Sequence, residues 1–347
     1  MREYGFNLRT LPALRRHYTE VLRLLIGALF GVLTITCACA SESGLIVVAP
    51  RTFVPALRDF AAAKVAHLPT ELVALEDILE SSDGIDDAEK LKRYLYERWL
   101  GGKLAYVLLV GDADVLPVRY MVLDRVTPAA FDYAFYPSDL YYADLAKADG
   151  SFEDWNARQE DFHGGYFGEV RGEKNKSEAI NFDQIDYLPD VAVGRWPVST
   201  AAQARSLAQK SLAGEEERAA RPYTERSVAL IGAKGWIDTR PHFDALQSAI
   251  GSGWKLERRL FEHQGKDRAN ETALVDLWNR GEDLILHAGH GLPDEWDQCF
   301  SAAALSRLGN GSRLPIVFSA GCSTAYFAAL APYDGYLDSK GLNHIGT

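Results

Sequence analysis

The sequence lacks an excess of positive charge, and it lacks a long apolar run. Its formal net charge is −11 over 347 residues, whereas a nucleic-acid-binding protein needs a basic face to meet the phosphates. We therefore expect no nucleic acid among its partners. The apolar stretch Leu24–Thr36 is shorter than the roughly 20 residues that a membrane-spanning helix needs. Because 47% of the residues are hydrophobic, we expect a globular protein with a sizeable core, not a disordered chain or a multispan membrane protein.

The first 40 residues have the pattern of an export signal. Arginines precede the apolar stretch, and small residues at 38–40 offer a cleavage site before Ser41. We expect residues 1–40 to be a signal peptide and the protein to be secreted, periplasmic or on the cell surface. A lipid anchor on Cys39 and an uncleaved membrane anchor are the alternatives. We therefore expect contact with a membrane only during export or through such an anchor.

Cysteine is scarce, with 4 in the whole chain. Cys37 and Cys39 belong to the expected signal, which leaves Cys299 and Cys322 in the mature protein. These two form either one disulfide or two free thiols, and a free thiol in an exported protein calls for an explanation. Cys299 has three interpretations: a buried core thiol, a disulfide partner of Cys322 in an inactive form, and a metal ligand.

Buried strands and helices alternate along most of the chain. Short apolar, β-branched runs predict strands, and the segments between them have the helical spacing of apolar residues. The expected strands are 44–49, 105–110, 191–193, 228–231, 283–286 and 314–318, and the expected helices are 54–65, 86–100, 201–220, 241–250 and 271–280. This alternation predicts an α/β fold with mostly parallel sheets and helices on both faces. The functional residues of such sheets gather beyond the carboxyl ends of the strands.

Changes in composition divide the chain into two expected subdomains. Residues 124–186 are rich in acidic residues, glycine and aromatics and have little periodicity, so we expect a long ordered insertion there. The charged run 214–226, which contains a proline, is the best candidate for the boundary. We therefore expect an N-terminal α/β subdomain at 41–222, which includes the insertion, and a second α/β subdomain at 223–347, which carries the site.

Two strands of the second half end in reactive side chains. His290 and Gly291 follow one strand, and Cys322 follows the other. Adjacent parallel strands lie about 4.8 Å apart, so both side chains could face one cleft. A thiol needs a neighbouring base to attack a carbonyl at neutral pH, and the N–H of Gly291 could hold the developing oxyanion. A helix that starts after Cys322 would also favour the thiolate.

Spacing alone does not establish catalysis. A lone cysteine after an apolar strand is more often a small core residue, and a lone histidine near a strand end is more often structural. A zinc site could use His287, His290 and Cys299. The glycine between the two histidines and the strand setting argue against a helical pair of zinc ligands, so we expect His287 to be structural.

The combined pattern resembles the gingipain-type cysteine peptidases of family C25, in the caspase and gingipain clan. The segments that carry the resemblance are YVLLVGD at 106–112 followed by Leu-Pro, PDVAVGR at 189–195, GHG at 289–291 with Trp296 close behind, and LPIVFSAGC at 314–322. It covers about residues 45 to 330. The resemblance implies a three-layer αβα fold in two subdomains and an endopeptidase that acts on proteins or peptides. It also implies Cys322 as nucleophile, His290 as base and no cofactor for catalysis.

The sequence departs from the gingipain pattern in three places. Gingipains carry an acid shortly after the strand that corresponds to 228–231; here Lys234 stands near that place, and Asp238 is the nearest acid. We expect Asp238 to orient His290 or to line a specificity pocket. Gly321 stands where the family usually has alanine. The chain also stops soon after Cys322, whereas gingipains continue, so we expect the catalytic subdomain to be truncated at its C-terminus.

Two other functions stay open beside a peptidase. One is a transpeptidase of the same family, which passes the acyl group to an amine, and the other is a catalytically inactive module that binds protein or glycan at the cell surface. The intact Cys–His pair argues against the inactive module, whereas Lys234 and the short C-terminus argue for it. The sequence does not indicate which side chain is preferred at P1.

Acidic residues of the insertion suggest a bound cation. They include Asp139, Asp144, Asp149, Glu153 and Asp154. Hard oxygen ligands of this kind suit calcium, and the resemblance implies structural calcium because gingipains bind it. The candidate ligands are Asp144 and Asp149, and a solvated acidic loop is the alternative. Asp112 and Asp114, which follow a strand, could serve a metal or simply cap the next turn.

Overall fold

The computed structural model describes residues 44–122, 133–155, 185–222, 225–235, 238–250, 253–328 and 331–332. The expected signal peptide and much of the expected insertion lie outside these residues. The chain forms two compact units, one of residues 41–215 with 326–347, and one of residues 1–40 with 216–325. We call them the first unit and the second unit. The division falls within helix α6 (Ala201–Ala220), close to the charged run where we expected the boundary.

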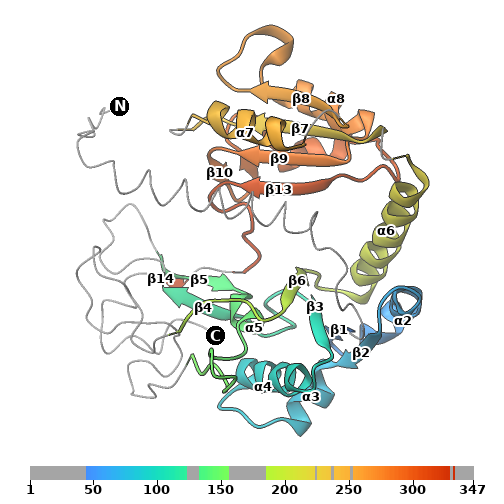
Figure 1. Cartoon of the computed structure of the whole chain (residues 1–347), viewed down its shortest axis with the longest axis vertical. Helices are drawn as coiled ribbons and strands as arrows, with labels where there is room; N and C mark the ends of the chain where they lie inside the picture. The colour runs from blue at the N-terminus through green and yellow to red at the C-terminus, as the bar shows by residue number, and fades with distance from the viewer. Residues whose placement is uncertain are drawn as a thin grey trace. The chain divides into compact units, whose positions relative to one another are not determined.

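The first unit is built on a four-stranded parallel sheet (Figure 1). Its strand order is β2 (Thr70–Ala74), β1 (Gly44–Ala49), β3 (Leu104–Val110) and β6 (Ala192–Trp196). Successive residues of β1 point to opposite faces, because side chains alternate along a strand. Ile46 and Val48 join a core cluster with α3 (Leu75–Ser81) and α4 (Asp87–Leu100), whereas Val47 and Ala49 join another with α2 (Val54–Val65) and α6. The sheet therefore lies between two helical layers.

Arg195 of β6 fixes the connections at the carboxyl end of this sheet. Its guanidinium makes a two-pronged ion pair with Asp139, at 2.7 and 2.8 Å, and also donates to the carbonyl oxygens of Gly111, Leu116 and Pro117. The side chain is only 5% exposed. One arginine thus satisfies several buried acceptors that follow β3, which is why a planar cation with five donors suits this position.

A small antiparallel sheet completes the described part of the first unit. It contains β4 (Arg119–Val122), β5 (Tyr133–Ser138) and β14 (Ala331–Pro332), in the order β14-β5-β4. The short helix α5 (Leu140–Ala143) follows β5, and Tyr141, Tyr142 and Trp155 are almost completely buried near it. Three aromatic residues of the expected insertion, Tyr141, Tyr142 and Trp155, therefore lie in the core.

The second unit repeats the parallel arrangement with a different strand order. The order is β13 (Ile316–Ala320), β9 (Leu284–Ala288), β7 (Ser227–Gly232) and β8 (Lys255–Leu260). Helix α7 (Arg240–Ile250) packs on one face with Val228 and Leu230, and α8 (Glu271–Arg280) packs on the other with Ala229 and Ile231. The αβα layering expected from the sequence is thus confirmed in both units.

Short elements join β9 to β13. They are β10 (Gly291–Leu292), β11 (Glu295–Trp296) and β12 (Phe300–Ser301), which form an antiparallel sheet, and the 3₁₀ helix η4 (Ala302–Arg307). A second 3₁₀ helix, η3 (Gly265–Asp267), follows β8. Within the described ranges, no helix has the length and apolar character needed to cross a bilayer.

The expected elements match the structure with a few differences. Strand β6 continues through Gly194 to Trp196 instead of ending at the glycine. Strands β2 and β8 were not expected, because charged residues interrupt their apolar pattern. The residues directly after Cys322 form turns, so within the described segment 321–328 there is no helix whose positive end could favour the thiolate.

Candidate active site

His290 and Cys322 follow neighbouring strands of the second unit. Strands β9 and β13 pair in parallel, with Ala288 opposite Ala320. His290 lies two residues after Ala288, and Cys322 lies two residues after Ala320. Because parallel strands in register end at the same edge of the sheet, the side chains of His290 and Cys322 start from equivalent places on adjacent strands.

The backbones that carry the two residues are in direct contact. A Cβ atom added to Gly291 would lie 2.6 Å from the carbonyl oxygen of Cys322 and would also collide with Thr324. Real Cβ atoms do not approach a backbone oxygen so closely, so only glycine allows this contact. The amide nitrogen of Gly291 also lies 3.2 Å from the Cβ position of Gly321. Gly291 therefore packs directly against the turn that carries Cys322, and its role as an oxyanion donor stays a prediction.

Backbone hydrogen bonds hold the loop of His290 from two sides. The N–H of His290 donates to the carbonyl of Lys234, which follows β7, at 2.8 Å. The carbonyl of His290 accepts from the N–H of Asp297 at 3.0 Å. Gly289 adopts φ +145°, and a Cβ there would lie 2.8 Å from the carbonyl oxygen of Ala233. The loop is therefore fixed by its backbone, and Lys234 contributes through its carbonyl group.

The loop of Cys322 is a tight turn at the edge of the sheet. The N–H of Gly289 donates to the carbonyl of Ala320 at 3.2 Å, and the hydroxyl of Thr324 donates to the carbonyl of Gly321 at 2.9 Å. Ser323 has a left-handed φ of 57°. Cys322 is exposed and is not in a disulfide. The turn therefore presents its thiol to solvent, as a nucleophile requires.

Cys299 has the opposite environment. Its side chain is 1% exposed, and its thiol donates to the carbonyl of Ala269 at 3.6 Å. Burial raises the pKa of Cys299 to about 11. Of the three interpretations, the structure shows the buried thiol: Cys299 is not bonded to Cys322.

His287 is packed inside the second unit instead of being presented at the site. Its ring stacks on Trp296 with centroids 4.1 Å apart and planes 3° apart, and its Nδ1 lies 2.9 Å from the hydroxyl of Ser319. Burial lowers the pKa of His287 to about 3. The ring is therefore neutral at physiological pH and belongs to the packing between β9, β11 and β13.

Asp238 lies just before α7 and pairs with a basic neighbour. Both of its carboxylate oxygens accept hydrogen bonds from the guanidinium of Arg240, at 2.7 and 2.8 Å. These bonds lower the pKa of Asp238. Its role in orienting His290 or in lining a specificity pocket stays a prediction, because the contacts of Asp238 shown by the structure are with its own helix.

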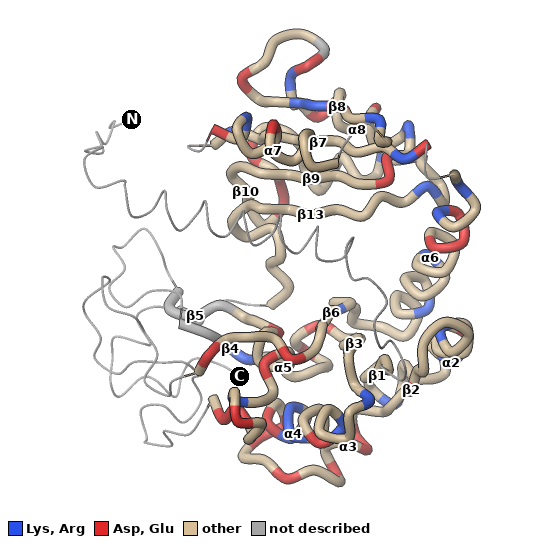
Figure 2. Tube along the Cα trace, viewed as in Figure 1, with Lys and Arg blue, Asp and Glu red and all other residues tan. Residues whose placement is uncertain are grey.

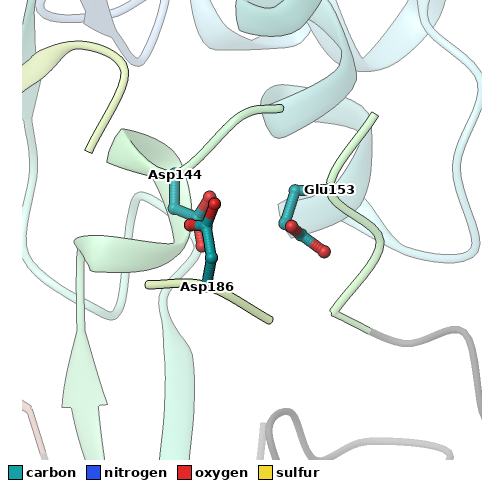
Figure 3. A group of neighbouring side chains, drawn as sticks. All are labelled: Asp144, Glu153 and Asp186. Atoms are coloured by element: carbon teal, nitrogen blue, oxygen red, sulfur yellow. The ribbon is translucent and has the colours of Figure 1, made fainter. Parts of the chain in front are cut away.

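The structure brings together a different acidic group from the one expected. Figure 3 shows Asp144, Glu153 and Asp186, and one oxygen from each lies within 4.8 Å of the others. Asp149 is not in this group: its carboxylate accepts hydrogen bonds from the N–H and hydroxyl of Ser151 in an exposed turn. Asp149 was a candidate because of the acidic composition of the insertion, whereas Asp186 comes from a distant segment that sequence reasoning did not connect to Asp144.

Asp112 has the structural role that we gave as its alternative. One oxygen accepts from the N–H of Asp114 at 3.1 Å, and the other accepts from the hydroxyl of Ser199. The carboxylate therefore caps the turn after β3 and joins it to the end of β6.

Comparison with protein families gives one match over most of the chain. The model of the family described as Peptidase family C25 matches residues 40–335. A curated protein of Archaeoglobus fulgidus, described as uncharacterized, is 24% identical over 232 residues, which are 64% of this chain and 48% of that protein. The chain thus spans about half the length of this relative.

Solved structures show the same fold. One is the complex of Porphyromonas gingivalis RgpB pro- and mature domains, with a TM-score of 0.55, 18% identity, and coverage of 84% of this chain and 58% of that chain. Another is the Arg specific cysteine proteinase gingipain R (RgpB), with a TM-score of 0.55, 18% identity, and coverage of 86% and 59%. A third, described as a protease, has a TM-score of 0.59, 16% identity, and coverage of 87% and 57%. At these identities the likeness shows the fold.

Proposed function

Because the chain belongs to peptidase family C25, we propose that it cleaves peptide bonds as an endopeptidase, with Cys322 as nucleophile and His290 as general base. One observation carries the assignment: the two residues lie two positions beyond the paired residues Ala288 and Ala320, at the same edge of one parallel sheet. The exposure of Cys322 supports it further, since the other described cysteine is buried.

The proposed reaction is an acyl transfer in two steps. His290 accepts the thiol proton of Cys322, and the sulfur forms a bond to the carbonyl carbon of the substrate. When the C–N bond breaks, His290 returns the proton to the leaving amine. Water then attacks the thioester while His290 accepts its proton, and the C–S bond breaks to release the carboxylic acid and the free thiol.

Gly291 is the proposed source of an oxyanion donor. Its backbone follows His290 directly and touches the carbonyl of Cys322. A backbone N–H at this place can donate to the oxygen that becomes negatively charged in the tetrahedral intermediate. The close contact requires glycine, so the same residue would allow the approach and supply the donor.

The proposed substrates are proteins or peptides, and no cofactor takes part in the reaction. One solved relative is described as Arg specific, and that preference belongs to that protein. For this chain we propose that P1 selectivity is decided by residues near the Cys322 turn, and a panel of P1 side chains is the direct way to determine it.

The proposed place of action is outside the cytoplasm. The support is the sequence of residues 1–40, where arginines, an apolar stretch and small residues follow one another as in export signals. Mass spectrometry of the protein recovered after expression with its own N-terminus tests this. A mature chain that begins at Ser41 is the expected result, and a full-length cytoplasmic chain contradicts it.

The test of the catalytic assignment uses the purified mature chain and acyloxymethyl-ketone probes. A panel with Arg, Lys and other residues at P1 is compared on wild type, Cys322→Ala and Cys299→Ala. We expect labelling of the wild type by at least one probe, complete loss in Cys322→Ala, and retention in Cys299→Ala. No labelling of a folded chain by any probe, in the presence of calcium and reductant, contradicts the proposal and favours an inactive binding module.

A second readout separates hydrolysis from transpeptidation. A cleavable peptide is incubated with and without an added amine acceptor, and the products are identified by mass. We expect free carboxyl termini in both cases. Products joined to the amine as the main species would show the transpeptidase instead.

A further inference from the structure

One side chain of the second unit, that of Thr324, contacts both turns of the proposed active site. Its hydroxyl donates to the carbonyl of Gly321 at 2.9 Å, within the turn that carries Cys322. Its methyl carbon Cγ2 occupies the position that a Cβ atom of Gly291 would take. The methyl group of Thr324 therefore fills the space beside Gly291 in which other residue types have a side chain.

The turn that carries Cys322 depends on such contacts because it has neither charge nor a relaxed backbone. Strand β13 and the described residues after it are tan in Figure 2, since none of residues 314–328 is charged, so ion pairs cannot hold the turn. Ser323 has a left-handed φ of 57°, which is unfavourable for a residue with a Cβ atom. Such a backbone persists only where its surroundings fix it.

The hydroxyl of Thr324 fixes the shape of this turn. Its bond to the carbonyl of Gly321 reaches back three residues, so it closes a ring that contains Cys322 and the strained Ser323. A closed ring limits the directions in which the Cα–Cβ bond of Cys322 can point. Because a displacement of about 1 Å at a reacting atom can lower a rate by about 100-fold, the hydroxyl acts on catalysis through the position of the thiol.

The methyl group of Thr324 fixes the distance between the turn and the loop of His290. The carbonyl oxygen of Cys322 lies 2.6 Å from the Cβ position of Gly291, and the methyl group of Thr324 packs against that same position. The N–H of Gly291 is the proposed oxyanion donor. The packing of Thr324 therefore sets the separation between the nucleophile and the donor, on which stabilisation of the oxyanion depends.

We propose that Thr324 is a positioning residue, whose hydroxyl orients the Cys322 turn and whose methyl group spaces that turn from Gly291. The inference rests on the proposed function, and it adds a residue to which that function gives no chemical step. A residue with only a structural role would change stability without a separate effect on kcat. The two roles of Thr324 are therefore distinguishable by experiment.

Two conservative substitutions separate the two groups of Thr324. Thr324→Val keeps the shape of the side chain and loses the hydroxyl, whereas Thr324→Ser keeps the hydroxyl and loses the methyl group. The matched control is Ser306→Ala in η4, because the hydroxyl of Ser306 donates to the carbonyl of Ala303 at 2.8 Å over the same separation of three residues. Steady-state kinetics of the purified mature chain, on a peptide found with the probe panel, give kcat and KM, and thermal unfolding gives the melting temperature.

Thr324→Val should lower kcat by about tenfold and leave KM within about threefold, because the turn loses its orientation while the binding contacts of the substrate remain. Thr324→Ser should keep kcat within about threefold of the wild type, and Ser306→Ala should leave kcat and KM unchanged. The melting temperature of Thr324→Val should fall no further than that of Ser306→Ala, which loses an equivalent hydrogen bond. A lower melting temperature of Thr324→Val with an unchanged kcat would overturn the proposal.

A double-mutant cycle with Gly291→Ala tests the contact of the methyl group. The loss of kcat/KM caused by Gly291→Ala is measured in the wild type and in chains that carry Thr324→Ser. We expect this loss to be at least about threefold smaller with Thr324→Ser, since the added Cβ atom then meets one obstacle fewer. Equal losses in the two chains would show that the methyl group does not space the turn from Gly291, and would overturn the proposal.

Hydrogen exchange separates failure of this proposal from failure of the proposed function. The exchange of peptides that cover residues 287–292 and 321–326 is followed by mass spectrometry in chains that carry Cys322→Ala, so the measurement needs no peptidase activity. Thr324→Val should speed exchange in 321–326, Thr324→Ser should speed it in 287–292, and Ser306→Ala should change neither. An inactive wild-type chain with these exchange changes would overturn the peptidase function and confirm the contacts of Thr324. An active wild-type chain without them would overturn the role of Thr324.

Discussion

Ala288 and Ala320 are opposite each other in the parallel pairing of β9 with β13, and the proposed catalytic residues each follow two positions later. The pairing gives His290 and Cys322 equivalent starting points on adjacent strands. Their relation therefore depends on the strand register and on the packing of the two turns that follow the strands.

The two histidines near the site should respond differently to substitution. His290→Ala removes the proposed base, so we expect kcat to fall by about 100-fold or more. His287→Phe keeps a ring that can stack on Trp296 and should leave kcat within about tenfold of the wild type. Steady-state kinetics on a peptide found with the probe panel measures both. Equal losses of kcat in the two variants would contradict the assignment of His290 as base and His287 as a packing residue.

The two glycines of the site form a second matched pair. A Cβ on Gly291 would lie 2.6 Å from a backbone oxygen, whereas a Cβ on Gly321 would have its nearest contact at 3.0 Å, with a side-chain atom of His287. We expect Gly291→Ala to lower kcat/KM by about 100-fold, because the turns must move apart. Gly321→Ala should cost about tenfold or less, since small shifts relieve its contacts. The reverse order would show that the loops are not packed as described.

The thiols should differ in reactivity with alkylating reagents. Cys322 is exposed, and burial raises the pKa of Cys299 to about 11. In the native mature chain we expect iodoacetamide to modify Cys322 and to leave Cys299 intact until denaturant is added. Peptide mapping by mass spectrometry identifies the modified residue. Rapid native modification of Cys299 would contradict its burial.

Acid should destabilise the second unit partly through His287. Its pKa is about 3 in the folded chain against an ordinary value of 6.5. Between these values the unfolded state binds more protons, so stability is fully present at neutral pH and falls as the pH drops below about 6.5, by up to about 1.4 kcal/mol per pH unit. Denaturant unfolding near neutrality and near pH 5 measures this loss. In His287→Phe the loss should be smaller by about 2 kcal/mol, and an unchanged loss would assign it to other groups.

Arg195 should be needed for the stability of the first unit. Arg195→Lys keeps the charge but cannot reproduce the paired contact with Asp139 together with the bonds to several carbonyls. We expect a loss of about 2 kcal/mol in the free energy of unfolding. The matched control is Arg205→Lys, at an exposed position of α6, which should change stability by less than about 0.5 kcal/mol. Similar effects of both substitutions would contradict the role given to Arg195.

Strong local patterns made much of the fold predictable. The runs 44–49 and 105–110 are short, apolar and β-branched, so they could be assigned to buried strands without knowledge of their neighbours. Helix α4 carries Asp86 as its N-cap, whose carboxylate accepts from the N–H of Glu89. In contrast, β8 has the sequence KLERRL, and only pairing with β7 makes it a strand.

The sequence by itself determined the alternation of strands and helices and the positions of His290 and Cys322 after two strands, because those properties depend on residues close together in the chain. Only the tertiary structure decided that β9 and β13 are neighbours in register, that Cys299 is buried, and that Asp186 joins Asp144 and Glu153. These relations depend on contacts between distant segments. Local spacing carries no information about them, since the packing of the whole unit selects which segments meet.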